Sequence, residues 1–506
     1  MAPTGFKAML FNSWSFIFLF LPIFLFLWEG TARLAPPLLP VLFLCASVIF
    51  YALWGLPWLI LLFCMIGMNY GLGIVLAANA ERPEKIATRR HILAISILLN
   101  ILPLIWFKYS WFIIENLALL FHSEWQFTPP ALPLGISFYT FIQIAWLVGV
   151  YRGMFRPSSF WQHALFSCAF PYIISGPIVR YDQIGSQLKN VSGLNAGNLS
   201  RGFTLFCMGL AKKAIIADSI GFYANAIFNA AEKNWPISCA EAWLGSLCYT
   251  FQLYFDFSGY TDMALGIGIM LGLRLPENFN SPYKATGIVD FWRRWHITLG
   301  AWLRDFLYIP LGGNRKGKLC QYRNLFLTML IGGAWHGAGW TFMLWGALHG
   351  FMLCINHFWR TSIPTSLVNR LEHGPFYRGL AILLTFFCVN LVWVVFRADS
   401  LDAALALYQT MFTYPFIPAE TVASNTSDYF GQILPNHYFT GWQPVGLLLI
   451  CVFLCWGCPN STQILSGRHT QFFWRPSRSW AICMAMLAFL SLTLLSRQST
   501  FLYFKF

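Results

Sequence analysis

One histidine lies in a run of small residues and is the first candidate for chemistry. The run reads GGAWHGAGW over residues 332–340 and contains His336. Glycine and alanine allow another backbone or a substrate to approach the imidazole closely. Because an imidazole titrates near neutral pH, this side chain suits the task of a general base. His336 is therefore a candidate base, and a packing or hydrogen-bonding role is the alternative.

A second histidine, His296, lies in a segment that mixes aromatic rings with charged groups. Residues 290–305 read DFWRRWHITLGAWLRD. This pattern predicts one amphipathic helix that lies at the membrane interface. On such a helix Asp290 and Arg294 are four residues apart and would form an ion pair. Arg293 would share a face with His296, which brings positive charge to the same side of the helix.

Two carboxylates occur in an apolar context that is unusual for ionised groups. Residues 252–262 read QLYFDFSGYTD and include Asp256 and Asp262. Ionisable residues inside membrane segments are costly, so their default interpretation is a functional site. We expect Gly259 to interrupt the helix between the two carboxylates. The alternative is that both cap helix ends and bind backbone amides.

Other catalytic motifs are absent from the sequence. It contains no Walker loop, no H-E-x-x-H and no G-x-S-x-G, which argues against an ATPase, a zinc protease and a serine hydrolase. Cys451, Cys455 and Cys458 have a spacing that can hold an iron–sulfur cluster in soluble enzymes. Here the three thiols end an apolar run, and we predict no metal site.

Composition indicates that lipid surrounds most of the chain. Of its 506 residues, 57% are hydrophobic and 10% are charged, whereas globular proteins average about 45–50% and 25%. The net charge of +14 comes from short loops between apolar runs. Positive loops on the cytoplasmic side of a membrane explain that pattern better than nucleic-acid binding. We predict an all-α, multi-pass membrane protein, folded as a single domain over residues 1–506.

Apolar runs long enough to approach membrane thickness recur along the sequence. The predicted spans are residues 14–28, 38–54, 57–77, 91–114, 135–150, 162–174, 202–220, 239–254, 260–273, 325–347, 379–396, 445–456 and 480–495. Some are short or rich in glycine, so the expected number of crossings is about eleven to thirteen, with some re-entrant segments.

Loop charges predict which side each polar stretch faces. Residues 274–323 carry nine basic residues against three acidic ones, so this stretch is predicted to be cytoplasmic. Residues 398–443 have few basic side chains and many Ser, Thr, Asn and Pro residues. We expect this second stretch to be an extracytoplasmic loop.

Several motifs resemble those of the membrane-bound O-acyltransferase (MBOAT) superfamily, and most closely its bacterial alginate O-acetyltransferase branch. The motifs are YFDFSGYTDMA (254–264), PENFNSPY (276–283), FWRRWHITLGAWLRDFLYIPLGGNR (291–315) and GGAWHGAGWTFMLWGALHG (332–350). Others are PLGISFYTFIQIAWLVGVYRG (133–153), SGPIVRYDQI (175–184), GLAKKAIIADSI (209–220) and FRADSLDAALALYQTMF (396–412). The resemblance covers residues 9–412, and together these motifs are highly specific.

The resemblance implies a helix bundle around a central tunnel with a cytoplasmic funnel. It implies His336 as the catalytic histidine and His296 as the second polar position of the site. An acetyl thioester, with acetyl-CoA as the expected donor, would enter from the cytoplasm. The other predicted substrate-binding and donor-binding residues are Arg293, Arg294, Arg304, Trp335, Trp340, Asp256 and Asp262, of which the arginines would bind the donor phosphates and the tryptophans would exclude water.

The resemblance also implies an acceptor on the opposite side of the membrane. The acceptor would be a polysaccharide hydroxyl, reached directly or through a periplasmic or secreted acetyltransferase partner protein. Alginate, peptidoglycan, cellulose and other exopolysaccharides stay open at this stage. Three alternatives also stay open, namely D-alanyl transfer to teichoic acid from a carrier protein, a proton-coupled transporter and a noncatalytic scaffold.

Overall fold

The computed structural model describes residues 9–80, 82–364, 374–413, 442–467, 472–495 and 502. Within these ranges the regular structure is helical, without β-strands. The chain divides into two compact units, one of Met1–Gly209 with Tyr260–Glu277 and one of Leu210–Gly259 with Asn278–Phe506. The prediction of a single domain stays a prediction.

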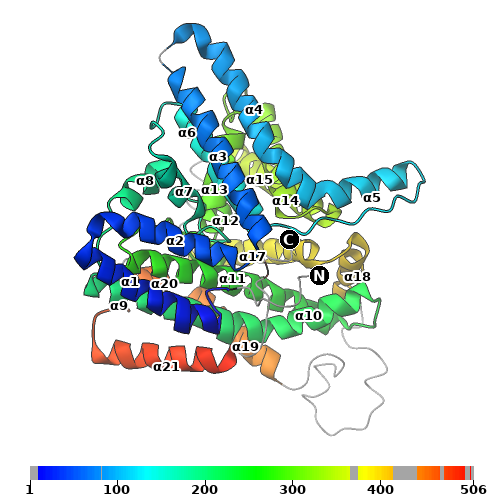
Figure 1. Cartoon of the computed structure of the whole chain (residues 1–506). Helices are drawn as coiled ribbons and strands as arrows, with labels where there is room; N and C mark the ends of the chain where they lie inside the picture. Colours follow the sequence, from blue (N-terminus) through cyan, green and yellow to red (C-terminus); the bar gives the residue numbers. More distant parts are fainter. Residues whose placement is uncertain are drawn as a thin grey trace. The chain divides into compact units, whose positions relative to one another are not determined.

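The first unit contains the part of α11 (Cys239–Met270) that follows Gly259, together with the helices that begin before residue 210. They are η1 (Phe16–Phe20), α1 (Leu21–Leu34), η2 (Pro36–Leu38), α2 (Leu39–Ala52), α3 (Leu56–Ala78), η3 (Pro83–Lys85), α4 (Ile86–Leu104), η4 (Ile105–Tyr109), α5 (Ser110–Leu120), α6 (Ile136–Tyr151), α7 (Phe160–Cys168), α8 (Tyr181–Lys189) and α9 (Ala196–Ala211). The helices α3 and α4 run side by side as the long blue pair in Figure 1, and α6 packs on both. The sequence of α6 is apolar on every side, and residues 138–150 are buried throughout.

The second unit contains the candidate histidines. Its helices are η5 (Lys212–Ala217), α10 (Asp218–Glu232), the first part of α11 (Cys239–Met270), η6 (Pro282–Lys284), α12 (Ile288–Arg294), α13 (Ile297–Leu303), η7 (Arg304–Tyr308), α14 (Lys318–His336), α15 (Trp340–Ser362), α17 (Pro375–Arg397), α18 (Leu401–Met411), α19 (Gln443–Val452), η9 (Phe453–Gly457), α20 (Ser461–Ser466) and α21 (Arg478–Leu494). In this unit α15 packs against α12, α14 and α17.

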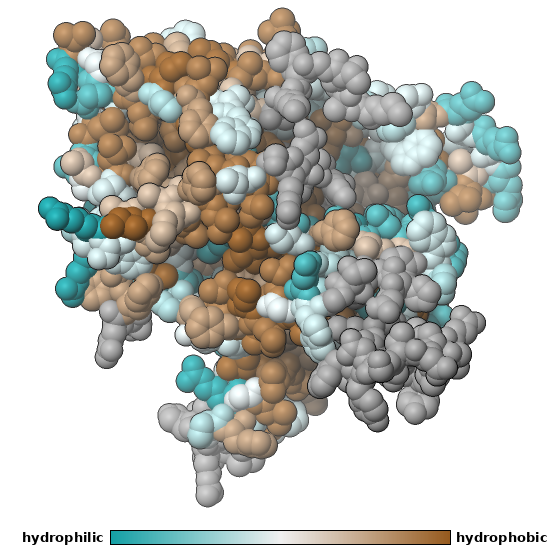
Figure 2. Space-filling model, turned by 90° about the horizontal axis from the view of Figure 1, so that it is seen from below, coloured by the Kyte–Doolittle hydropathy of each residue, from teal (hydrophilic) through white to brown (hydrophobic). Residues whose placement is uncertain are grey.

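Apolar helices confirm the predicted all-α polytopic membrane class. Four stretches are long and apolar enough to cross a bilayer, namely Phe16–Leu34, Leu56–Ala78, Ile86–Leu120 and Pro375–Arg397. Large apolar side chains such as Phe26 and Phe376 are at least 80% exposed, and Figure 2 shows hydrophobic residues over much of the face it presents. Such surface is stable against lipid rather than water. The number of crossings, the central tunnel and the cytoplasmic funnel stay predictions.

Two predicted boundaries are wrong, and each concerns glycine. The single helix α11 covers the predicted span 239–254 and residues 260–270 of the predicted span 260–273, so Gly259 does not interrupt it. A lone glycine costs a helix only about 1 kcal/mol, and the buried neighbours of Gly259 supply packing that offsets it. The predicted span 325–347 is instead two helices, because Gly337 and Gly339 are extended (φ −158° and −170°) between α14 and α15.

The predicted extracytoplasmic loop 398–443 is described only in part. Residues Leu401–Met411 form α18. The remainder from 414 to 441 lies outside the described residues. Its position relative to the membrane stays a prediction.

Candidate active site

The first candidate histidine ends a helix whose partner helix packs unusually close. His336 is the last residue of α14, and α15 starts four residues later. A Cβ atom at Gly333 would lie 2.3 Å from the carbonyl oxygen of Phe342, and one at Gly346 would lie 2.4 Å from that of Met329. Real Cβ atoms do not approach so closely, so glycine is required at both positions. The glycines therefore fix the hairpin that positions His336.

Aromatic rings surround the His336 imidazole. This side chain is buried, and its ring centroid lies 4.8 Å from that of Trp335, 5.0 Å from Trp345 and 5.3 Å from Phe396. Rings packed edge to face at these distances keep bulk water away. Trp340, predicted for the same task, is 56% exposed as the first residue of α15.

Sequence reasoning missed two of these rings. Trp345 is four residues before His349 on α15, so the two share a helical face. That spacing could have identified Trp345 in advance. Phe396 comes from the end of α17, sixty residues after His336, and local spacing gives no signal for a contact of that kind.

The second candidate histidine lies at a break between two short helices. His296 separates α12 from α13 and has a left-handed backbone, with φ 42° and ψ 54°. The prediction of one continuous amphipathic helix over residues 290–305 is therefore wrong. A left-handed residue cannot continue a right-handed helix, and non-glycine residues adopt this conformation rarely.

The break brings His296 towards His336. The two ring centroids are 6.5 Å apart, and the ring of Phe257 packs edge-on against His296 at 4.8 Å. His296 is fully buried, and this loss of water contact lowers the pKa of its imidazole to about 3. The ring is therefore neutral at physiological pH, with one N–H donor and one acceptor nitrogen.

A third histidine, His349, connects α15 to α12. The Trp292 side chain on α12 donates a hydrogen bond from Nε1 to Nδ1 of His349 on α15, at 3.3 Å. His349 is fully buried, and its ring packs 4.8 Å from that of Trp345. The hairpin of α14 and α15, which positions His336, therefore also contacts α12, and His296 follows α12 in the chain.

The two predicted carboxylates, Asp256 and Asp262, lie in different units of the chain. Asp256 forms a buried ion pair with Lys213 (Nζ–Oδ1 2.6 Å), and Lys213 also pairs with Asp218 at 2.7 Å. The other oxygen of Asp256 accepts the Leu502 amide at 3.1 Å. Asp262 is buried and belongs to the first unit. Substrate binding by Asp256 and Asp262 stays a prediction.

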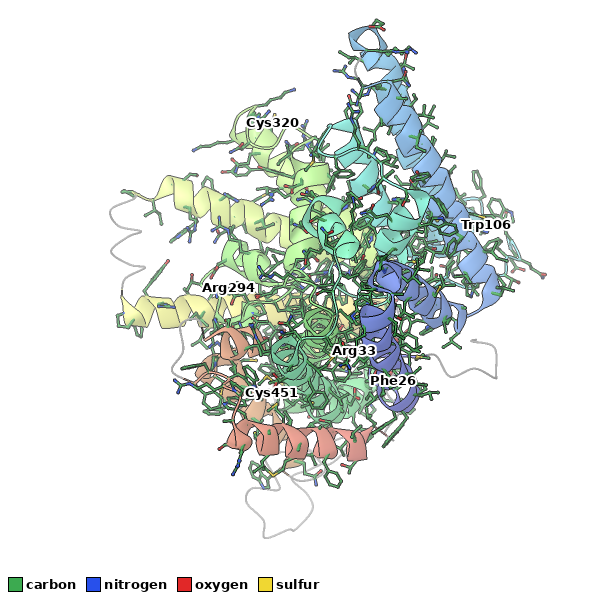
Figure 3. The ribbon with its side chains drawn as sticks, turned by 60° about the vertical axis from the view of Figure 1, so that its left-hand side comes forward. Phe26, Arg33, Trp106, Arg294, Cys320 and Cys451 are labelled. Atoms are coloured by element: carbon green, nitrogen blue, oxygen red, sulfur yellow. The ribbon has the colours of Figure 1, made fainter. Side chains whose placement is uncertain are left out.

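The predicted donor-binding arginines lie at the surface of the second unit. The expected ion pair between Asp290 and Arg294 is confirmed, with 2.8 Å between Oδ1 and Nε, and Arg294 is labelled in Figure 3. Arg304 is paired with its neighbour Asp305 at 2.6 Å, and Arg293 is exposed. Among the described residues no group of three or more His, Cys, Asp or Glu side chains could hold a metal ion.

Comparison with known proteins identifies the family. The model of the membrane-bound O-acyltransferase family (MBOAT) matches residues 47–396. The peptidoglycan O-acetyltransferase of Helicobacter pylori is 38% identical over 99% of this chain and 98% of its own length. The probable alginate O-acetylase of Azotobacter vinelandii is 40% identical over 80% of this chain and 78% of its own length. The teichoic acid D-alanyltransferase of Streptococcus thermophilus is 27% identical over 52% of this chain and 68% of its own length. With both histidines inside the matched range, the chain belongs to the membrane-bound O-acyltransferase family and is an acyltransferase.

Proposed function

We propose that this protein moves an acetyl group from a cytoplasmic thioester to a hydroxyl of an extracytoplasmic acceptor, for O-acetylation of a cell-envelope glycan. The observation that carries the proposal is the pair of buried histidines 6.5 Å apart inside an aromatic enclosure. The family supplies the reaction class, and the two O-acetylating relatives described above are at least 38% identical to this chain. We place the protein in the bacterial inner membrane.

His336 is the proposed general base. It accepts the proton of the acceptor hydroxyl as that oxygen attacks the acetyl carbonyl carbon, and the C–S bond of the thioester then breaks. The leaving thiolate takes up the proton from the imidazolium, so His336 returns to its neutral form. General-base catalysis of this kind is worth roughly 10²–10⁴-fold in rate.

His296 is the proposed donor to the developing oxyanion. A neutral imidazole carries one N–H, and burial keeps His296 neutral. A donor aimed at developing charge is most effective where water is excluded. The two ring centroids are 6.5 Å apart, and we propose that the acetyl carbonyl group binds between the imidazoles. Trp335 and Trp345 support this role, because their rings keep water from hydrolysing the thioester.

The proposed donor is acetyl-CoA, which would leave no cofactor bound between turnovers. Its phosphates are anions, and Arg293, Arg294 and Arg304 provide guanidinium groups that bind such oxygens in pairs. A periplasmic or secreted acetyltransferase partner is proposed to pass the acetyl group onward where the glycan does not reach the site itself. Neither role requires a metal ion.

Peptidoglycan is the favoured acceptor. The relative named for peptidoglycan O-acetylation aligns with 99% of this chain, whereas the alginate relative aligns with 80%. An alginate-like exopolysaccharide is the second candidate. D-alanyl transfer to teichoic acid is the third, because that relative aligns with only 52% of the chain.

The test is His336→Ala, expressed in cells that lack the native copy of the protein. Alkali-released acetate is measured separately in purified peptidoglycan and in secreted polysaccharide. His91→Ala, at an exposed position of α4, is the matched control. We expect His336→Ala to abolish acetylation of one fraction at normal protein levels, and that fraction identifies the acceptor. Normal acetylation in His336→Ala would overturn the proposed role of His336.

A further inference from the structure

The left-handed backbone of His296 needs support from outside its own segment. His296 is one of four residues other than glycine with positive φ among the described residues. Such backbone conformations persist only where surrounding bonds determine them, and they gather at functional sites. The support must come from groups that bond to the residues on both sides of His296.

Residues 278–280 supply these bonds. The amide of Asn280 donates to the carbonyl oxygen of Arg294 at 2.9 Å, before the break. After the break, the Ile297 amide donates to the carbonyl oxygen of Asn278 at 3.0 Å. The turn is therefore bonded on both sides to the same short segment, residues 278–280.

The side chain of Asn278 adds bonds that the backbone cannot make. Its Oδ1 accepts the Thr298 hydroxyl at 2.6 Å and the Thr298 amide at 3.4 Å. Asn278 is fully buried and Thr298 is 7% exposed, so this pair is shielded from competing water. Thr298 is the second residue of α13, and its amide belongs to the first turn, where helix amides require an external acceptor.

Asn278, and not His296, accepts the first-turn amide of α13. His296 occupies the N-cap position of α13, where a side chain commonly accepts an amide of the first turn. Within the described chain the His296 side chain does not cap α13. Asn278 provides the acceptor instead, and the ring centroid of His296 lies 6.5 Å from that of His336.

We infer that Asn278 is a positioning residue that caps α13 in place of His296 and so holds the His296 imidazole towards His336. This inference rests on the proposed function, because it assigns Asn278 a role through His296. Loss of the Asn278 side chain leaves the backbone bonds of residues 278 and 280 in place. The turn therefore still forms, and the orientation of His296 is what changes.

The test compares Asn278→Ala, Thr298→Val and Thr298→Ser. Thr298→Val removes the hydroxyl that bonds to Asn278, and Thr298→Ser retains it. We expect Asn278→Ala and Thr298→Val to lower glycan acetylation at least tenfold at normal protein levels, and Thr298→Ser to retain more than half of it. The double variant Asn278→Ala/Thr298→Val should lose no more than the worse single variant, because both break the same bond.

A background without the imidazole separates positioning from general stability. In His296→Ala, the further change Asn278→Ala should cause no additional loss of the residual acetylation, since the group it positions is already gone. An additional loss there, or equal activity of Thr298→Val and Thr298→Ser, would overturn the inference. If Asn278→Ala does not accumulate, the comparison of valine with serine at Thr298 decides.

The outcomes distinguish this inference from the proposed function. Loss of acetylation in His296→Ala with normal acetylation in Asn278→Ala leaves the proposed function standing and removes Asn278 from it. Normal acetylation in His296→Ala removes the proposed role of His296 and the inference with it. His336→Ala reports on the proposed function independently of both.

Discussion

Each unit contains a buried pair of polar side chains, and the two pairs are built differently. In the first unit Asn69 on α3 and Asn100 on α4 donate to each other at 2.9 and 2.7 Å. Each amide also donates to a carbonyl oxygen one turn earlier. In the second unit, the rings of His296 and His336 are 6.5 Å apart, which is too far for a direct hydrogen bond between them.

The difference separates structural from chemical polar groups. A pair whose members satisfy each other joins two helices and has little left to offer a ligand. A pair held apart by the surrounding fold can bind a third group between its members. The ion group of Lys213, Asp218 and Asp256 belongs to the first kind, because Lys213 pairs with both carboxylates within the group. Loss of a self-satisfied member should lower stability, whereas loss of a separated histidine should lower catalysis.

The largest effect on stability is expected from Lys213→Met. The change leaves the carboxylates of Asp218 and Asp256 buried without their cation, which costs about 3–5 kcal/mol. We expect a large fall in membrane-inserted protein and in its melting temperature in detergent. Lys212→Met is the control, because that half-buried lysine bonds to the neutral Ser461 hydroxyl at 2.9 Å and should have a much smaller effect. Equal melting temperatures for the two variants would contradict a stabilising role of the Lys213 ion pairs.

The second-largest effect on stability is expected from Gly333→Ala, in the hairpin of α14 and α15 that positions His336. The added methyl group would meet the Phe342 carbonyl oxygen at 2.3 Å, so α14 and α15 must move apart at a cost of about 1–3 kcal/mol. His336 is three residues further along α14, and we expect acetylation per molecule to fall as well. Gly379→Ala on α17, where nothing lies within 4 Å of the new atom, should match the unmodified protein in both assays.

The asparagine pair should give a smaller and purely structural effect. Asn69→Leu leaves the amide of Asn100 without its partner, and interhelical hydrogen bonds in membranes are worth about 1–2 kcal/mol. The double variant Asn69→Leu/Asn100→Leu should recover part of that loss, because no unpaired amide remains. Melting temperature in detergent and acetylation per molecule are the two readouts. A loss of acetylation per molecule would contradict a purely structural role for the asparagine pair.

Sequence reasoning selected the two histidines, whose catalytic roles stay predictions, but not the geometry that brings them together. The types and neighbours of His336 and His296 identified them, and the apolar runs predicted the helical membrane class. The break at His296 depends on bonds from Asn278, eighteen residues away, and no local pattern reports such bonds. Glycine gave opposite outcomes at Gly259 and Gly337, because neighbouring packing decides whether a helix continues through it.

Arg294→Met is expected to have the smallest effect on stability and a specific effect on donor binding. The pair of Arg294 with Asp290 is half-exposed, and pairs of that kind contribute about 0–1 kcal/mol. The melting temperature should therefore change little. If Arg294 binds donor phosphates as proposed, the apparent KM for acetyl-CoA should rise severalfold in purified protein at constant kcat.

Asp290→Asn distinguishes a role of Arg294 in the ion pair from a role in binding the donor. This variant also breaks the ion pair, but it retains the guanidinium of Arg294 and releases it from its carboxylate. The KM for acetyl-CoA should therefore stay the same or fall, in contrast to the rise expected for Arg294→Met. Because the guanidinium and not the pair would bind an anion, equal KM values in the two variants would mean that Arg294 only stabilises α12.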